Sequence, residues 1–285
     1  MKKNNAVVFG LTSNHVFAVA CVMMDIKRIC PGMVDEVVII HDGIRAKDQK
    51  ILAAILPTRF IFYDLPANSR TVLGARVVRQ FTKMVFSKFE CLRLLDDYKN
   101  VMWLDYDMVV QRDISDLFSS CAPGIKMMPG GLPVRGQLLA PVDEFDMEAE
   151  GMCACVFVFQ EGLGNHEAMH RFCYDMLERY AEVLYLGEQA IFDFLLQEFR
   201  LAPMPIDARV YSAHPNDPVN APHAKIIHAY GQPKFWNGID NDQWHSNYRA
   251  WLSLGGTRYR KPPMANRLLR GIRGVAHRMR KARAK

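Results

Sequence analysis

The sequence predicts an α/β fold in which helices cover both faces of a mostly parallel central sheet. Two observations predict it. Short apolar runs of strand length alternate with longer segments whose apolar residues recur at helical spacing. The order along the N-terminal part is strand, helix, strand, helix, which is typical of parallel sheets because each parallel strand needs a long return connection. The chain has 285 residues, 50% of them hydrophobic, which is ample for a large core.

The N-terminal half carries the clearest elements. The apolar runs predict strands at residues 6–9, 36–41, 60–63 and 101–104, and the periodic segments predict helices at 16–29, 48–56 and 80–95. A polar loop, Thr12-Ser13-Asn14-His15, follows the first strand, and Asp42-Gly43 ends the second. Sheets of this kind bind ligands at the carboxyl ends of their strands. We therefore look for function in the residues that follow these strands.

The C-terminal half is less regular. A region rich in Gly and Pro at 123–133 and an acidic loop at 143–150 are followed by a predicted strand at 156–160. Two helices are predicted next, at 165–184 and 187–197; then come a loop rich in Pro, Asn and His at 203–223 and a last strand at 224–229. No internal repeat is found.

The net charge of +6 belongs to the C-terminal end. Residues 257–285 hold eleven of the 36 Lys and Arg side chains and no acid, so the rest of the chain has 25 basic and 30 acidic residues. A nucleic-acid-binding protein carries its basic residues on the folded domain. The composition of the body therefore excludes a nucleic-acid partner.

The cysteine pattern and the N-terminal residues indicate the cellular compartment of the protein. The seven cysteines form no CxxC pair, which argues against a zinc ribbon, and their apolar neighbours favour reduced, mostly buried thiols. Cys153 and Cys155 face the same side of a predicted strand, and we interpret them as core thiols rather than a metal site. The first residues lack the apolar segment of a signal peptide, and no stretch reaches transmembrane length. We expect a cytoplasmic protein, in solution or at the inner face of a membrane.

Asp105-Tyr106-Asp107 is the strongest chemical signal. It follows the fully apolar run Val101-Met102-Trp103-Leu104. Residues i and i+2 of an extended chain face the same way, so the two carboxylates can share one hard divalent cation, which also binds diphosphates. The alternative is a pair of solvated loop acids, or a cap for a helix at 114–118, and two acids alone would favour it.

Five segments, in order, resemble glycosyltransferase family 8, which includes glycogenin and bacterial lipopolysaccharide galactosyl- and glucosyltransferases. The segments are Phe9–Asn14 with Phe17, Lys88, Lys99–Val110 with Asp113–Phe118, Val156–Gln160 with Gly187–Ala190, and His228–Trp236. The resemblance covers residues 6–240 and implies a GT-A fold, a Rossmann-like sheet, with a nucleotide-sugar donor, Mn²⁺ (or Mg²⁺) and retention of anomeric configuration. The matches also imply site residues. Asp105, Asp107 and His228 would hold the metal; Glu188 and Gln189 would lie at the transferred sugar; the donor would contact Leu11, Thr12, Asn14, Phe17, Lys88, Tyr106, Gly231 and Lys234.

Each of these roles has a simpler alternative. His228 could be a core histidine, Phe17 a packing residue of the first helix, Lys234 a solvated lysine, and Glu188 a residue that favours a helix N-terminus. We read the mechanism as front-face displacement, in preference to double displacement through a covalent intermediate.

The chain departs from the family pattern at several positions. Cys153-Ala154-Cys155 stands where the family has Asn-Ala-Gly or Asn-Ser-Gly, so the amide that contacts donor sugar is missing. Glu188 replaces Asp, Phe235 replaces Pro, and Tyr106 replaces a small or acidic residue. None of these changes removes a predicted metal ligand.

We divide the chain into a GT-A domain at 1–255 and a basic appendage at 256–285. Residues 265–281 have the pattern of an amphipathic helix, with Leu268, Leu269 and Ile272 on one face and arginines mostly on the other. Such a helix fits an anionic membrane surface, the alternative being a solvated terminus weakened by its two glycines.

The predicted reaction is transfer of galactose or glucose from a UDP-sugar to a glycan or lipid-linked acceptor of a bacterial surface. The alternative from another class is an inactive family member that binds nucleotide-sugar or a partner. A nucleotidyltransferase would need a Gly-rich phosphate loop after the first strand, which this sequence lacks.

Overall fold

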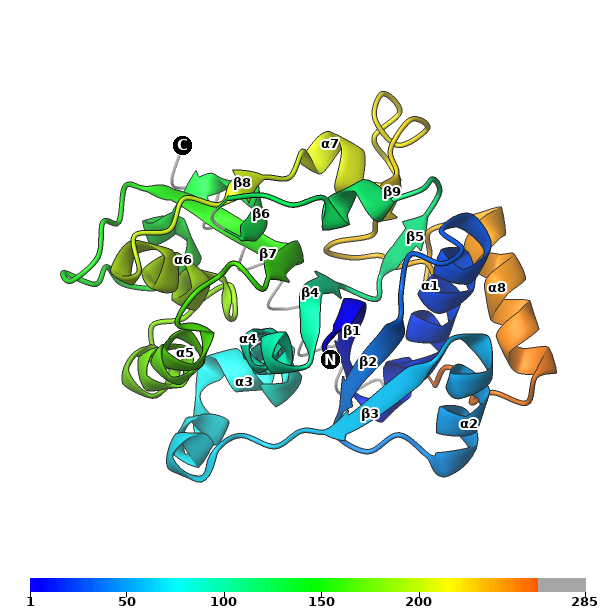
Figure 1. Ribbon diagram of the computed structural model, residues 1–285, viewed down its shortest axis with the longest axis horizontal. Helices are drawn as coiled ribbons and strands as arrows, with labels where there is room; N and C mark the ends of the chain where they lie inside the picture. Colours follow the sequence, from blue (N-terminus) through cyan, green and yellow to red (C-terminus); the bar gives the residue numbers. More distant parts are fainter. Residues whose placement is uncertain (123, 261–285) are drawn as a thin grey trace.

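The computed structural model describes residues 1–122 and 124–260, which are built around one seven-stranded sheet (Figure 1). Its strand order is β3-β2-β1-β4-β7-β6-β8. The strands are β1 (Lys3–Leu11), β2 (Glu36–His41), β3 (Thr58–Phe62), β4 (Tyr98–Leu104), β6 (Ile125–Pro133), β7 (Glu150–Gln160) and β8 (Met204–Pro205). The four N-terminal strands pair in parallel, β7 is antiparallel to both β4 and β6, and β8 is parallel to β6. The mostly parallel sheet of the predicted fold class is confirmed.

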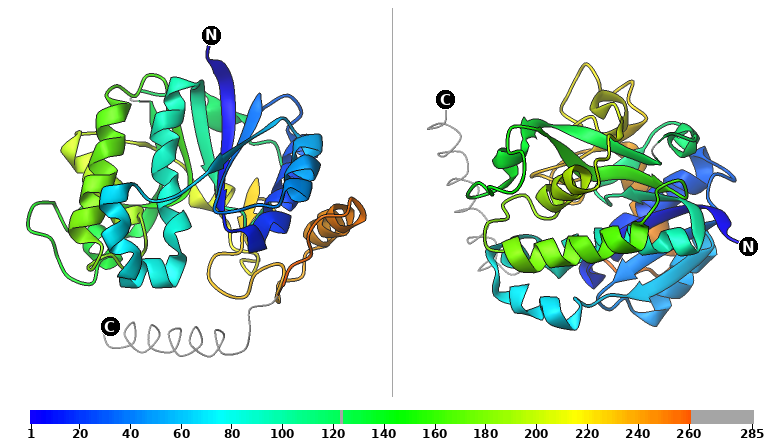
Figure 2. Two further views of the ribbon diagram at one scale, coloured as in Figure 1. Left: turned by 90° about the horizontal axis from the view of Figure 1, so that it is seen from below. Right: turned by 60° about the vertical axis from the view of Figure 1, so that its left-hand side comes forward.

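Helices cover both faces of this sheet, as the two views of Figure 2 show. On one face lie α1 (Val16–Ile29), α2 (Ala46–Ile55) and α8 (Asp242–Ser253); on the other lie α3 (Arg76–Phe81), α4 (Glu90–Arg93), α5 (His166–Tyr180) and α6 (Gln189–Glu198). Side chains of the central strands alternate between two cores. In β1, Val7 and Phe9 face α1, and Ala6 and Val8 face the opposite core. This two-sided burial explains why the strands read as continuous apolar runs.

The prediction of one long helix at 80–95 is wrong. The segment is divided into the end of α3, the 3₁₀ segment η3 (Lys83–Phe89), α4 and the 3₁₀ segment η4 (Leu94–Asp96). Thr82 breaks the helix because its φ is +69°, a conformation that the α-helix does not allow, and its hydroxyl accepts a hydrogen bond from the N–H of Met84. Lys88 consequently lies in η3 rather than on a regular helix.

The Gly/Pro-rich and loop regions hold more structure than the sequence predicts. β6 occupies most of 123–133, and the predicted loop at 203–223 contains β8 and α7 (Ala208–Tyr211). The remaining 3₁₀ segments are η1 (Ser13–His15), η2 (Ala67–Gly74), η5 (Ser115–Phe118) and η6 (Val134–Gln137). A second, two-stranded sheet pairs β5 (Met108–Val110) with β9 (Ile226–His228). This small sheet positions the site described below.

Residues after α8 return to the body. Trp251 donates its indole N–H to the carbonyl of Thr257 at 2.9 Å, and the Thr257 hydroxyl donates to Asp48 at 2.6 Å. The predicted amphipathic helix at 265–281 lies outside the described residues, so its membrane role stays a prediction. None of the helices within the described part combines the length and hydropathy of a membrane-spanning segment.

Candidate active site

The Asp105-Tyr106-Asp107 segment joins two sheets. β4 ends at Leu104 and β5 begins at Met108, so the segment leaves the main sheet at a carboxyl end and enters the small sheet. The Asp105 N–H donates to the carbonyl of Cys155 at 3.0 Å, which fixes the start of the connection against β7. At its end, the Ala229 N–H donates to the Asp107 carbonyl at 2.9 Å. The backbone of both aspartates is therefore held at a strand end.

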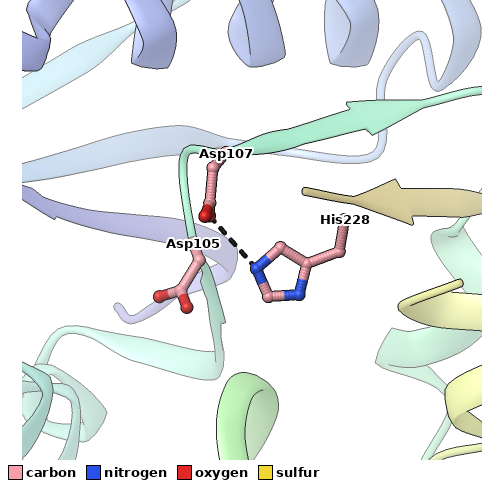
Figure 3. Close-up of side chains that lie close together, drawn as sticks. All are labelled: Asp105, Asp107 and His228. Atoms are coloured by element: carbon pink, nitrogen blue, oxygen red, sulfur yellow. Dashed lines mark hydrogen bonds and ion pairs between the residues drawn. The ribbon is translucent and has the colours of Figure 1, made fainter. Parts of the chain in front are cut away.

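Pairing of β5 with β9 brings in the histidine. Met108 lies directly opposite His228, which places the imidazole beside Asp107 (Figure 3). One ligand atom each from Asp105, Asp107 and His228 lies within 4.8 Å of the others, and no other group of three His, Cys, Asp or Glu side chains among residues 1–122 and 124–260 is so close. Two carboxylates and one imidazole are a donor set that divalent cations such as Mn²⁺ accept. The structure thus brings together the three residues predicted to hold a metal.

Two basic side chains contact Asp107. Its carboxylate lies 3.1 Å from Nε2 of His228 and also contacts Nζ of Lys234. Burial acts to raise the pKa of Asp107, but His228 and Lys234 together hold it well below its ordinary value. Burial likewise acts to lower the pKa of His228, and Asp107 raises it. Lys234 donates further to the Ala229 carbonyl at 2.8 Å, so its ammonium is fixed at this carboxylate.

Ser212 orients the imidazole of His228. Its hydroxyl lies 2.9 Å from Nδ1, the ring nitrogen opposite the one that faces Asp107. A partner of this kind fixes the ring of a metal-binding histidine and tunes its basicity. Ser212 follows α7 in the segment that the sequence marks only as a loop, so no sequence signal identifies it.

Lys88 links Asp105 to Glu188. Its ammonium lies 3.2 Å from Asp105 and 2.6 Å from Glu188, and it donates to the Ala154 carbonyl at 2.8 Å. Burial acts to lower the pKa of Lys88, but the two carboxylates raise it above its ordinary value. Trp103 donates its indole N–H to the same oxygen of Asp105 at 2.8 Å. Both aspartates of the cluster are therefore paired with a lysine.

Glu188 and Gln189 open α6 beside this network. The Glu188 side chain is buried, which raises its pKa although Lys88 acts in the opposite direction. Gln189 is partly exposed and donates its amide to the Leu186 carbonyl at 3.1 Å. Through Lys88, Glu188 is connected to Asp105, so side chains from three distant segments of the chain meet here.

The predicted donor-binding loop, residues 11–14, is linked to Tyr106 through His15. The Tyr106 ring stacks on His15 with centroids 5.1 Å apart, and His15 bonds the Thr12 hydroxyl at 3.0 Å. Asn14 donates to the carbonyl of Arg260 at 3.3 Å. Leu11 is the last residue of β1, and Gly231 has a φ of +75°, which favours glycine at that position.

Phe17 is placed differently from the other predicted donor contacts. It is only 1% exposed and packs edge-on against Trp236 and Trp244, with Tyr248 and Tyr259 close by. This enclosure favours the packing role that the sequence left open.

Cys153 and Cys155 border the network around Lys88. Their sulfurs lie 3.3 Å apart; Cys155 is buried and Cys153 is partly exposed. The hydrogen bond between the Cys153 and Cys155 thiols lowers the pKa of Cys153 to about 7, against the effect of burial. Cys155 Sγ also lies 3.7 Å from Ser212 Oγ. The two thiols share one face of the strand, as predicted.

Residues 6–124 match the sequence model of glycosyl transferase family 8. That segment contains the first strand, Lys88 and both aspartates of the cluster. The match confirms the resemblance of these motifs to family 8. The match supports glycosyl transfer as the role of the chain. No curated protein matches the sequence closely enough to count as a relative.

Several solved structures share the fold. WbbM, a bifunctional glycosyltransferase, aligns with a TM-score of 0.65 at 15% identity, over 89% of this chain and 51% of WbbM. The galactosyltransferase LgtC, in complex with donor and acceptor sugar analogues, aligns with a TM-score of 0.63 at 14% identity, over 91% and 98%. GlyE of Streptococcus pneumoniae TIGR4 aligns at 0.57 and 17% identity, over 88% and 64%. The chain thus spans about half the length of WbbM, and the GT-A fold is confirmed.

Proposed function

We propose that this chain, whose residues 6–124 belong to glycosyl transferase family 8, is a retaining hexosyltransferase that uses a UDP-sugar and a divalent metal, Mn²⁺ or Mg²⁺. The observation that carries the proposal is the convergence of Asp105, Asp107 and His228 at the end of β4, each with a partner that fixes its side chain. The likeness to LgtC, which binds donor and acceptor sugar analogues, supports a nucleotide-sugar and a sugar acceptor here as well.

The residues of the cluster would bind and orient the diphosphate end of the donor. Asp105, Asp107 and His228 would hold a divalent ion, which would supply a Lewis acid to stabilise negative charge on a leaving diphosphate. Lys234 lies at Asp107 and can donate to a phosphate oxygen from the same place. Gly231 lets backbone approach the diphosphate without a side chain in the way. Leu11, Thr12, Asn14 and Tyr106 would hold the nucleoside.

The state of Glu188 supports front-face displacement. A nucleophile for double displacement must reach the anomeric carbon with one carboxylate oxygen. Glu188 is only 2% exposed and gives one oxygen to the Lys88 ammonium at 2.6 Å, so its access to a sugar is restricted. A carboxylate held in this way can stabilise positive charge on the sugar. Gln189, at the first turn of α6, would bind the sugar or the acceptor. The similar structure LgtC has an active-site glutamine, and its glutamate variant is also among the solved structures.

The hexose is galactose or glucose, and the acceptor is a glycan or a lipid-linked precursor of a bacterial surface. The missing Asn at Cys153 leaves the choice of sugar to other contacts. The test is release of UDP from UDP-galactose and UDP-glucose, with and without Mn²⁺, in the presence of oligosaccharide acceptors. Metal-dependent release of UDP from either donor is expected.

The Cys153-Ala154-Cys155 segment favours one other function, an inactive member that binds nucleotide-sugar or a partner. Binding of UDP with Mn²⁺ but no release of UDP with any donor or acceptor would support that alternative. No binding of UDP at all would contradict both.

A further inference from the structure

Three sulfur atoms meet on one face of the sheet, beside the acidic cluster. Met128 of β6 is the direct cross-strand partner of Cys153 in β7. Cys153 Sγ lies 3.3 Å from Cys155 Sγ, and Cys155 Sγ lies 3.8 Å from Met128 Sδ. We call Met128, Cys153 and Cys155 the sulfur cluster.

An irregularity in the sheet creates this arrangement. The pairing of β6 with β7 passes from Met127 opposite Phe157 to Met128 opposite Cys153, so residues 154–156 lie between two paired positions. Hydrogen bonds from Asp105 and Lys88, which belong to neither β6 nor β7, hold the backbone of this stretch. The Cys155 carbonyl accepts from the Asp105 N–H, and the Ala154 carbonyl accepts from the Lys88 ammonium at 2.8 Å. The sulfur positions are thus set by the fold rather than by a mobile loop.

We propose that the sulfur cluster binds one soft monovalent metal ion, Cu(I) in its reduced physiological form and Ag(I) as its redox-inert analogue. Thiolate and thioether ligands select such ions over hard divalent cations. With metal–sulfur bonds of about 2.3 Å, three sulfurs around one ion would lie roughly 4 Å apart, close to the two distances present.

Zinc is a poorer fit for the same atoms. Structural zinc takes four ligands from Cys, His and carboxylates. No third His, Cys, Asp or Glu joins Cys153 and Cys155 in a close group within residues 1–122 and 124–260. The third ligand available to the two thiols is a thioether, which favours Cu(I) or Ag(I).

Charge and access also fit a monovalent ion. Binding breaks the two S–H bonds of Cys153 and Cys155, forms two thiolate–metal bonds and one thioether–metal bond from Met128, and releases two protons to solvent; the oxidation state of the metal does not change. The product carries one negative charge, one less than the two thiolates would carry without the ion. Met128 is 2% and Cys155 4% exposed, so these two ligands are shielded from water. Cys153 is partly exposed, and a metal ion would reach the cluster from its side.

The binding is tested by titrating the reduced, metal-free protein with Ag(I) in chloride-free buffer without added thiol, and counting bound ions by native mass spectrometry. Cu(I) is then delivered anaerobically from its bicinchoninate complex, and its transfer is followed by loss of the chelate colour. We expect one tightly held ion per chain. Cys153→Ser and Cys155→Ser should each weaken binding by at least about 100-fold, and Met128→Leu by about 10-fold, because each removes one ligand.

Cys121→Ser is the matched control, since Cys121 is also partly exposed but its sulfur has a backbone carbonyl, that of Ile125, as its partner. It should bind as the unchanged protein does. Circular dichroism and a thermal melt establish that each variant is folded. Unchanged binding in Cys153→Ser, or loss of the ion in Cys121→Ser, would overturn the proposal. None of these readouts depends on glycosyl transfer, so the sulfur cluster and the proposed function fail or succeed separately.

Discussion

Met108 and His228 lie opposite each other in the two-stranded sheet of β5 and β9, although they belong to opposite halves of the chain. This pairing, with the hydrogen bond from Ala229 to the Asp107 carbonyl, sets the 3.1 Å contact between Asp107 and His228. β5 and β9 have three residues each and are far apart in the chain. Their pairing therefore determines whether the three predicted metal ligands share one site. The predictions below test that site and the network around it.

Asp107→Ala should weaken Mn²⁺-dependent binding of UDP by at least about 100-fold, because it removes one metal ligand and the partner of both His228 and Lys234. Isothermal titration of UDP with and without Mn²⁺ measures the effect. Asp107→Asn keeps the side-chain volume and should show the same loss, whereas Asp113→Ala, which removes an exposed acid from the same segment, should not. Equal Mn²⁺-dependent affinity in Asp107→Ala and the unchanged protein would contradict the metal site.

Ser212→Ala should reduce Mn²⁺ affinity by about 10-fold, since the hydroxyl 2.9 Å from His228 Nδ1 no longer orients the ring. Ser69→Ala is the matched control. Ser69 is also buried, but its hydroxyl has no hydrogen-bond partner among the residues described. A titration of Mn²⁺ in the presence of UDP compares the two. If both variants bind Mn²⁺ equally well, Ser212 does not position the imidazole.

Lys88→Met should lower the free energy of unfolding by about 3 to 5 kcal/mol, because it leaves Glu188 buried without its cation. The double variant Lys88→Met with Glu188→Gln should cost less than the two single changes summed, since neither charge remains. Urea unfolding gives all three values.

Lys83→Met provides the comparison for this pair. Lys83 pairs with Asp64 at 2.7 Å, and the two side chains are 25% and 41% exposed, compared with 8% and 3% for Lys88 and Glu188, so the change should cost under about 1 kcal/mol. A Lys88 variant no less stable than the Lys83 variant would show that the buried network contributes little.

Asp193→Asn should stabilise the protein at alkaline pH. Burial raises the pKa of Asp193 to about 8, and one carboxylate oxygen has no partner among the residues described. The folded state therefore binds a proton that the unfolded state has lost above a pKa of about 4, so stability falls as pH rises between these values. The amide removes this loss while its oxygen can still accept from the Met152 N–H.

The expected gain from this change is on the order of 5 kcal/mol at pH 8 and close to zero at pH 4, because each unit between the two pKa values contributes about 1.4 kcal/mol. Urea unfolding across this pH range measures it. Asp175→Asn, at an exposed position of α5, is the control and should leave the profile unchanged. Parallel pH profiles for Asp193→Asn and the unchanged protein would refute the raised pKa.

Deletion of residues 264–285 should release the protein from vesicles that contain phosphatidylglycerol, because it removes most of the basic residues of the C-terminal end. It should leave UDP release intact, since the contact from Asn14 to the Arg260 carbonyl remains. Co-sedimentation at low and high salt measures the binding. Equal sedimentation with and without these residues would contradict the membrane role.

Local patterns were sufficient for the strands and for the aspartates. α1 and β2 have the bounds that the sequence predicts, because in both the apolar pattern ends at an evident boundary: Pro31-Gly32 after the helix and Asp42-Gly43 after the strand. Asp105 and Asp107 follow a fully apolar strand, so their place at a carboxyl end could be predicted. The break at Thr82 could not, since a positive φ at a threonine depends on the packing of η3 around it.

By itself the sequence determined the alternation of strands and helices, the place of the two aspartates and the motifs shared with family 8, because each depends on residues close together in the chain. The tertiary structure alone decided that β9 pairs with β5 and that Lys88 bridges Asp105 and Glu188. It also brought Ser212 to His228 and Met128 to Cys155. These contacts join residues far apart in the chain. They form only when burial of both cores has fixed the sheet. A local sequence pattern cannot show which distant side chains this burial brings together.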